Sequence, residues 1–211
     1  MKYESHGLTR KEYFNEAAKW WDEKYYTKEL VNRLEKLVPR FGLKPGQKIL
    51  DAGTGTGVLI PFLLRIIGPS GSIIAIDYAD KMVEVFKSKF SGIPNVKVEL
   101  KDVEELDYPS EYFDAAVCFG LFPHLERREK ALSNLNRVLK ESGRLIIAHA
   151  LSSSEIREHH KGASPVAEDA LPEEMEMRYL LEEAGFTEIQ ITDEPGSYLC
   201  IAIKCQKHPD P

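Results

Sequence analysis

A glycine-rich turn that follows an apolar segment constrains the fold of this chain more than any other feature. Residues 49–57 read ILDAGTGTG, and a second apolar segment starts directly after them. Because glycine has no Cβ, a turn that contains Gly53, Gly55 and Gly57 lets a ligand come close to the backbone. The stretch therefore predicts a strand, a tight turn with a ligand beside it, and the start of a helix.

An acidic residue, Asp77, ends the next apolar segment along the chain. A glycine turn after one strand and an acid at the end of the next are the layout of a site for a cofactor that contains a nucleoside. The spacing departs from the dinucleotide pattern, because Val58 stands where that pattern has its third glycine. Asp51, just before the turn, would repel a pyrophosphate and attract a cationic head group.

The rest of the chain alternates between predicted strands and helices. The strands are expected at residues 47–51, 72–77, 96–100, 114–119, 144–150, 186–192 and 198–204. Strands that alternate with helices favour an α/β fold, with a seven-stranded, mostly parallel sheet and helices on both faces. The last two strands are joined by a short Pro-Gly turn, which only an antiparallel pair allows. One strand near the edge of the sheet is therefore expected to be antiparallel.

We expect one domain over residues 1–211 with three parts. These are N-terminal cap helices at 1–45, a cofactor-binding core at 46–150, and a lid segment followed by a helix and two strands at 151–211. The connection after the fifth strand is long for a strand-to-helix link. Open α/β sheets bind ligands at the carboxyl ends of their strands, so this connection is expected to cover the site.

Composition and charge argue against several classes of protein. The net charge of −6 opposes a nucleic-acid partner. No apolar run is as long as the roughly eighteen residues that a membrane-spanning helix needs. The first residues also lack the apolar centre of a signal peptide. Cys118, Cys200 and Cys205 form no Cys-x-x-Cys pair, so neither a disulfide framework nor a zinc ribbon is indicated. We expect a cytoplasmic protein, monomeric or homodimeric, that does not insert into membranes.

Five segments, in order, resemble the motifs of class I S-adenosylmethionine-dependent methyltransferases. They are residues 51–57, 76–83, 101–106, 113–119 and 139–145. The resemblance extends over roughly residues 13–150 and is closest to the type that acts on small molecules, including quinone-type methylases. It implies a Rossmann-like fold, S-adenosylmethionine as the cofactor, S-adenosylhomocysteine as its product, and transfer of a methyl group.

The resemblance also implies which residues hold the polar parts of the cofactor. Asp51 and the turn formed by Gly53, Thr54 and Gly55 would hold its amino-acid moiety. Asp77 would accept hydrogen bonds from both ribose hydroxyls, because a carboxylate offers two acceptor oxygens.

Further positions are implied around the adenine and the reactive methyl. Tyr78 and Met82 would pack near the adenine ring. Asp102 would accept a hydrogen bond from its amino group, and the backbone of Val103 would meet the ring edge. Phe119, just past the fourth strand, would line the mouth where the methyl emerges.

Four histidines follow the fourth and fifth predicted strands: His124, His149, His159 and His160. Topology allows all four to converge where the methyl would emerge. We favour His124, His149 and His160 as candidates for a general base and His159 as an acceptor-binding residue, with no resident metal. The alternatives are a metal bound by two or more of them, or a structural role for His124 with solvated His159 and His160. His149 lies in an apolar strand, where it is costly unless its nitrogens are paired.

Aromatic residues near the N-terminus are predicted to contact the methyl acceptor. Residues 13–22 resemble the cap helix of the small-molecule methyltransferases. Trp20, Tyr25 and Tyr26 are predicted to close over the acceptor, whereas Phe14 and Trp21 are expected to pack against the sheet.

The resulting functional prediction is methyl transfer to a small molecule, at carbon or oxygen, with a sulfur or metalloid acceptor also left open. After the fourth strand the chain reads FGLF at 119–122 and lacks the Asn/Asp-Pro-Pro-Tyr type of segment. Methylation of nucleic-acid or glutamine nitrogen is therefore disfavoured. Two alternatives remain: a nicotinamide-dependent oxidoreductase, which the glycine spacing and Asp51 oppose, and a protein that binds S-adenosylmethionine without catalysis.

Overall fold

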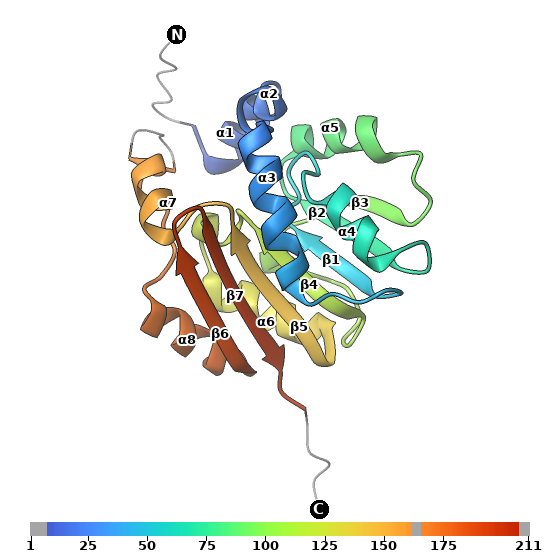
Figure 1. The fold of residues 1–211 in the computed structure, drawn as a ribbon, viewed down its shortest axis with the longest axis vertical. Helices are drawn as coiled ribbons and strands as arrows, with labels where there is room; N and C mark the ends of the chain where they lie inside the picture. The colour runs from blue at the N-terminus through green and yellow to red at the C-terminus, as the bar shows by residue number, and fades with distance from the viewer. Residues whose placement is uncertain (1–7, 162–165, 207–211) are drawn as a thin grey trace, which may run out of the picture.

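A seven-stranded sheet runs through the centre of the molecule, with helices on both faces (Figure 1). The structure is a computed structural model that describes residues 8–161 and 166–206. The strands are β1 (Lys48–Ala52), β2 (Ser72–Asp77), β3 (Val96–Leu100), β4 (Phe113–Phe119), β5 (Leu139–His149), β6 (Phe186–Glu194) and β7 (Ser197–Lys204). The α-helices are α1 (Arg10–Ala17), α2 (Trp21–Tyr25), α3 (Lys28–Leu37), α4 (Ile60–Ile67), α5 (Asp80–Phe90), α6 (Arg128–Val138), α7 (Ser153–His160) and α8 (Glu174–Glu183).

The strand order is β3-β2-β1-β4-β5-β7-β6. The pairs from β3 to β5 are parallel, and β7 is antiparallel to both of its neighbours, β5 and β6. The predicted Rossmann-like α/β fold, with one antiparallel strand next to the edge, is confirmed. The order reverses direction at β1, so a crevice opens at the carboxyl ends of β1 and β4, where doubly wound sheets bind their ligands.

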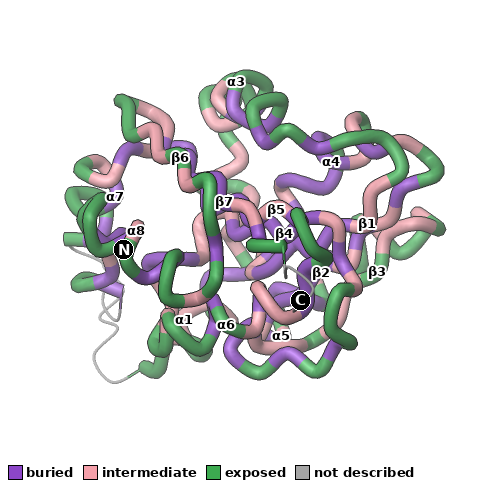
Figure 2. Tube along the Cα trace, turned by 90° about the horizontal axis from the view of Figure 1, so that it is seen from below, coloured by how far each residue is buried: buried purple, intermediate pink, exposed green. Residues whose placement is uncertain are grey.

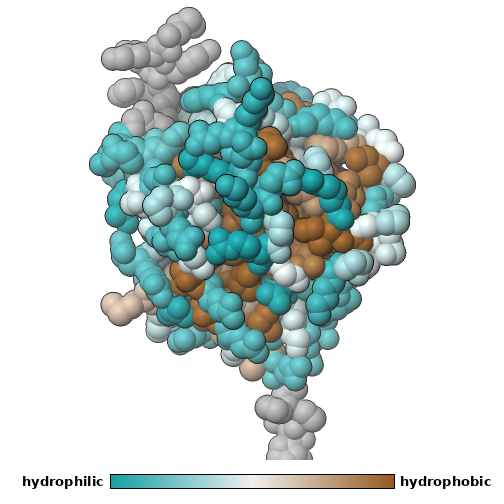
Figure 3. Space-filling model, in the orientation of Figure 1, coloured by the Kyte–Doolittle hydropathy of each residue, from teal (hydrophilic) through white to brown (hydrophobic). Residues whose placement is uncertain are grey.

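Alternate residues of each strand supply two separate cores. Ala115 and Val117 of β4 pack with α3, α4 and α5 on one face, whereas Ala116 and Cys118 pack with α6 and α8 on the other. Buried residues accordingly follow the central strands in Figure 2. The outside of the face that α3 and α4 cover is mostly hydrophilic, with apolar areas visible between the charged side chains (Figure 3).

The fifth strand is longer than predicted and the helix before it is shorter. We expected a helix to Lys140 and a strand from Arg144, but α6 ends at Val138 and β5 starts at Leu139. Leu139 already pairs with Phe113, and the register shifts before Arg144 pairs with Ala115. The residues that looked like a turn therefore form a bulge within the strand.

The N-terminal helices and α7 lie over the same end of the sheet (Figure 1). Thr9 caps α1 and Ser152 caps α7, each in a capping box with the Glu three residues later. No helix of the described residues is both long and apolar enough to cross a membrane.

Candidate functional site

A cavity of about 450 Å³ opens where α1, α2 and α7 cover the carboxyl ends of the strands. That volume lies in the range of small-molecule sites, roughly 300–1,000 Å³. All ten residues predicted to bind the cofactor line this one cavity: Asp51, Gly53, Thr54, Gly55, Asp77, Tyr78, Met82, Asp102, Val103 and Phe119. The structure therefore brings the predicted cofactor residues together.

The three glycines of the turn have different reasons to be glycine. Each has a positive φ. A Cβ on Gly53 would lie 2.7 Å from Leu121 Cδ1, and one on Gly57 would lie 2.5 Å from Phe90 Cε2. A Cβ on Gly55 would meet no atom within 4 Å. Gly53 and Gly57 are thus required by the packing of the protein, whereas Gly55 faces the space that a ligand would fill.

Two buried carboxylates stand beside this turn. Asp51 and Asp77 are only 2% and 7% exposed. The Thr54 hydroxyl donates to Asp51 Oδ2 at 2.6 Å, and the Gly55 amide donates to Asp77 Oδ2 at 2.8 Å. The Ala79 amide donates to the other oxygen of Asp77 at 2.9 Å. Among the ion pairs of residues 8–161 and 166–206, none includes either acid.

The pKa of both acids is raised, because no ion pair among the described residues offsets their burial. Burial raises the pKa of Asp51 to about 7, against the hydrogen bond from Thr54, and the charge of Asp77 raises it further. Burial raises the pKa of Asp77 to about 6, despite the hydrogen bonds from the backbone. A cationic ligand would favour the ionised form of both acids. The geometry and chemistry of this pocket therefore fit a positively charged ligand beside Gly55.

The residues predicted near the adenine line the same cavity as Asp77. Met82 is buried against Ala18 and Ala79, and the Tyr78 ring lies 6.3 Å from that of Phe14. Asp102 accepts a hydrogen bond from the Glu104 amide at 2.8 Å and so caps the short helix that begins at Val103. These side chains enclose a largely apolar slot with a fixed acid at its edge.

The cap lines the cavity with a different set of aromatic side chains from the predicted one. Tyr25 and Tyr26 line it as predicted, but Phe14 and Trp21 line it as well and Trp20 does not. Trp20 stands at the break between α1 and α2, where φ is −126° and ψ is 4°. The Trp20 ring stacks on that of Trp21, with the ring centroids 6.3 Å apart.

Polar contacts tie the cap to the glycine turn. The Thr56 hydroxyl donates to the Asp22 carboxylate and lies 3.2 Å from the Tyr26 hydroxyl. Lys89 of α5 completes the group, with its Nζ 2.8 Å from Asp22 and above the Tyr26 ring. The roof of the cavity is therefore fastened to the residue that follows Gly55.

The four histidines all line the cavity. The rings of His124 and His160 lie 5.2 Å apart, and those of His159 and His160 lie 5.8 Å apart. His160 is 6% exposed, so the alternative in which it is solvated is wrong. No group of three His, Cys, Asp or Glu side chains suited to a metal ion is found in the part of the chain that the structure describes.

His149 has a buried nitrogen without a partner. Its Nδ1 makes no hydrogen bond, and its Nε2 lies 3.9 Å from where a Cβ on Gly120 would stand. Burial, reinforced by the neighbouring histidines, lowers the pKa of His149 to about 3, so the ring is neutral. An unpaired buried nitrogen at the cavity wall is a polar group that a ligand could satisfy.

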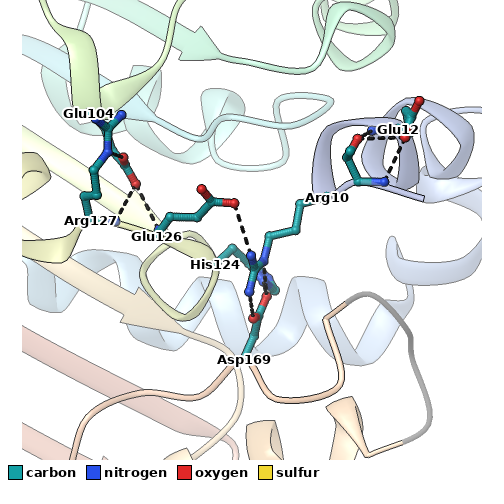
Figure 4. A network of polar contacts seen from close by, with 8 residues as sticks. Arg10, Glu12, Glu104, His124, Glu126, Arg127 and Asp169 are labelled. Carbon is teal, nitrogen blue, oxygen red and sulfur yellow. Dashed lines mark hydrogen bonds and ion pairs between the residues drawn. The ribbon is translucent and has the colours of Figure 1, made fainter. Parts of the chain in front are cut away.

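The sequence analysis missed Asp169, which lies between α7 and α8. Its carboxylate accepts hydrogen bonds from His124 Nδ1 at 2.7 Å and from Arg10 Nη2 at 2.6 Å (Figure 4). Its backbone carbonyl accepts from His160 Nδ1 at 2.5 Å. Arg10 also contacts Glu126 at 3.2 Å. One acid in the lid segment thus joins the cap to two of the candidate histidines.

Comparisons with known proteins agree with this geometry. Residues 49–143 match the family described as a methyltransferase domain. The chain is similar to the ubiquinone/menaquinone biosynthesis C-methyltransferase UbiE of Vibrio vulnificus, with 38% identity over 109 residues, which are 50% of this chain and 42% of that protein. The protein of the same name from Francisella tularensis subsp. novicida is 29% identical over 180 residues, covering 83% of this chain and 66% of the relative.

The match therefore spans less than two thirds of the length of these relatives. Among solved structures, a SAM-dependent methyltransferase from Aquifex aeolicus superposes with a TM-score of 0.74 at 29% identity. The superposition covers 90% of this chain and 97% of that one.

Proposed function

We propose that this chain, which belongs to the class I S-adenosylmethionine-dependent methyltransferases, transfers a methyl group from S-adenosylmethionine to a small molecule. One observation carries the proposal: two buried acids, with no ion pair among the described residues, flank a glycine that opens onto the cavity. A ligand that carries both a positive charge and a nucleoside satisfies this arrangement. A pyrophosphate, as in a nicotinamide cofactor, would place like charges beside Asp51.

The residues of the turn would hold the cofactor by its polar groups. Asp51 and the turn from Gly53 to Gly55 would bind the amino-acid moiety, and Asp77 the ribose. Tyr78, Met82, Asp102 and Val103 would enclose the adenine. When bound, S-adenosylmethionine supplies a methyl group that its sulfonium already activates.

The remaining wall of the cavity would receive the methyl acceptor. Tyr25 and Tyr26 contribute ring faces from the cap, and the four histidines contribute nitrogens that can bind or deprotonate a hydroxyl. The relatives are named as C-methyltransferases of quinone biosynthesis. We therefore propose a small aromatic or hydroxylated acceptor that is methylated at carbon, with oxygen as the second possibility.

The proposed partner is a small molecule rather than a nucleic acid, and a cytoplasmic monomer or homodimer is the proposed state. The acidic net charge supports a partner other than a nucleic acid. The free thiols of Cys118, Cys200 and Cys205 support the proposed cytoplasmic location.

Calorimetry and a transfer assay test the function together. We expect S-adenosylmethionine and S-adenosylhomocysteine to bind the full chain, and labelled methyl to appear in at least one member of a panel of hydroquinones and phenols. Binding of NAD in preference to S-adenosylmethionine would overturn the proposal. Cofactor binding without transfer to any acceptor would favour a binding protein without catalysis.

A further inference from the structure

Asp169 fixes the protonation of two histidine rings at the cavity wall. An ionised carboxylate and a backbone carbonyl can only accept hydrogen bonds. The Asp169 carboxylate faces Nδ1 of His124 at 2.7 Å, and its carbonyl faces Nδ1 of His160 at 2.5 Å. In both rings, therefore, Nδ1 must carry the hydrogen and donate it.

The consequence appears at the opposite nitrogen of each ring. A neutral imidazole with its hydrogen on Nδ1 has a lone pair on Nε2. Within residues 8–161 and 166–206, no hydrogen bond to Nε2 of His124 or His160 is found, and both residues line the cavity. Two histidines of the cavity lining thus have the same nitrogen, Nε2, able to accept a proton.

We propose that Asp169 is a positioning residue that holds His124 in the Nδ1–H tautomer, so that Nε2 of His124 receives the proton of the methyl acceptor. This inference rests on the proposed function for the transfer step and on the geometry alone for the tautomer. In that step the acceptor loses one proton to Nε2 and gains one methyl. The electron pair of the broken sulfur–carbon bond stays on sulfur, and the proton passes on to solvent.

The charges around Asp169 suit that role. Burial opposes ionisation of Asp169, but the hydrogen bonds from His124 and Arg10 outweigh it and hold its pKa at about 2. Burial lowers the pKa of His124, against the attraction of Asp169, so the free ring is neutral near pH 7. When the ring takes a proton, its new charge lies beside a carboxylate that is already ionised. Arg10 keeps that carboxylate in place from the cap.

A substitution of Asp169 can change its contact with His124 and leave its contact with His160 as an internal control. Asp169→Asn keeps the backbone carbonyl that binds His160 but replaces the carboxylate that binds His124. A carboxamide can donate as well as accept, so it does not fix the tautomer of His124. Glu126→Gln is the matched control, because Glu126 is the other carboxylate on Arg10 and, among the described residues, has no hydrogen bond or ion pair with either ring.

Ring-nitrogen NMR of the full chain, labelled at histidine, tests the tautomers directly. Spectra of His124→Gln and His160→Gln assign the signals. In the unsubstituted protein we expect hydrogen on Nδ1 and a lone pair on Nε2 for both rings. Asp169→Asn should shift His124 toward a mixture while His160 stays unchanged, and Glu126→Gln should change neither. Hydrogen on Nε2 of His124 in the unsubstituted protein would overturn the proposal even if Asp169→Asn fails to fold.

Two further measurements separate this inference from the proposed function. Calorimetry with S-adenosylmethionine should give the same Kd, within about twofold, for Asp169→Asn and the unsubstituted chain, because Asp169 lies outside the glycine turn. Transfer of labelled methyl to methoxyhydroquinone, the probe, should show kcat lower by about a hundredfold or more, because Asn neither fixes the proton-accepting tautomer of His124 nor stabilises the charge of the protonated ring. Unchanged kcat with an altered His124 tautomer would leave the methyltransferase proposal standing and remove Asp169 from it. Failure of S-adenosylmethionine to bind the unsubstituted chain would reject the function, while the NMR result would still decide the tautomer.

Discussion

The Asp77 carboxylate accepts the backbone amide of Gly55 at 2.8 Å, across 22 residues of sequence. The acid that ends β2 and the turn that follows β1 are therefore one hydrogen-bonded unit. Because both residues line the cavity, the unit holds the proposed ribose-binding acid and the open glycine in place together. A substitution of either residue should alter the position of the other.

Asp77→Ala should weaken binding of S-adenosylmethionine by at least about tenfold, or about 1.4 kcal/mol. The substitution removes the proposed ribose acceptor and leaves the Gly55 and Ala79 amides without their partner. Calorimetry measures the change. Asp80→Asn is the control, since that acid is exposed and pairs with Lys11, and its affinity should match the unsubstituted chain. Normal binding by Asp77→Ala would show that the cofactor lies elsewhere.

Gly55→Ala should mainly weaken cofactor binding, whereas Gly57→Ala should mainly lower the stability of the fold. Alanine at Gly55 meets no protein atom, so only its left-handed backbone costs stability, about 1–2 kcal/mol, while its methyl enters the ligand space. Alanine at Gly57 meets the Phe86 and Phe90 rings and should lower the free energy of unfolding by a further 1–3 kcal/mol, roughly the cost of overpacking. Chemical denaturation and cofactor calorimetry on both variants check this. Equal cofactor affinity in Gly55→Ala and the unsubstituted chain would argue against a ligand beside Gly55.

The contribution of Asp51 to the stability of the cofactor-free protein should fall as the pH rises from about 4 to 7. Asp51 has a pKa of about 7 in the folded chain and near 3.8 when unfolded, so the folded state holds the extra proton across that window. Stability falls with pH wherever the folded state binds more protons. His149 acts in the opposite direction, because folding lowers its pKa from 6.5 to about 3. The stability of Asp51→Asn should therefore rise more steeply with pH than that of the unsubstituted chain.

The gain in melting temperature on adding S-adenosylmethionine should follow the opposite trend. Above pH 7 both acids are ionised and attract the cation, so the gain should be larger at pH 8 than at pH 5. Thermal melts with and without the cofactor give both slopes. A slope in Asp51→Asn equal to that of the unsubstituted chain would contradict the assignment.

Arg10→Ala should affect binding of the acceptor but not binding of the cofactor. The change removes the link between α1 and Asp169, whose side chain is 3% exposed, and should lower the free energy of unfolding by about 3 kcal/mol, as for a broken buried pair. KM for the acceptor should rise while Kd for S-adenosylmethionine stays the same. Lys11→Ala, which removes an exposed pair on the same helix, should cost less than about 1 kcal/mol and leave both constants unchanged.

The cofactor side of the site could be predicted from the sequence because its signals are local. The strand, the glycine turn and the acid that ends the next strand are read from short segments, and the parallel sheet places them together. The same holds for the antiparallel β7, which follows from a turn too short for any other connection. The limits of β5 could not be predicted, because a bulge and a turn share the same small residues.

The acceptor side depends on contacts that no local pattern encodes. Arg10 and Asp169 are 159 residues apart, and nothing in the neighbourhood of either marks the pair. The break between α1 and α2 falls at Trp20, which lies outside the cavity lining, whereas Trp21 belongs to it. Positions of this kind follow from how the cap and lid dock, which is settled only in the complete fold.

The hydrogen bond from Thr56 to Asp22 ties the roof of the cavity to the residue that follows Gly55 at its floor. Gly55 borders the ligand space, and the next residue fastens α2. A rotation of the peptide that joins them moves both surfaces in one step. A change in the turn on cofactor binding would therefore be passed to the cap through this one hydrogen bond.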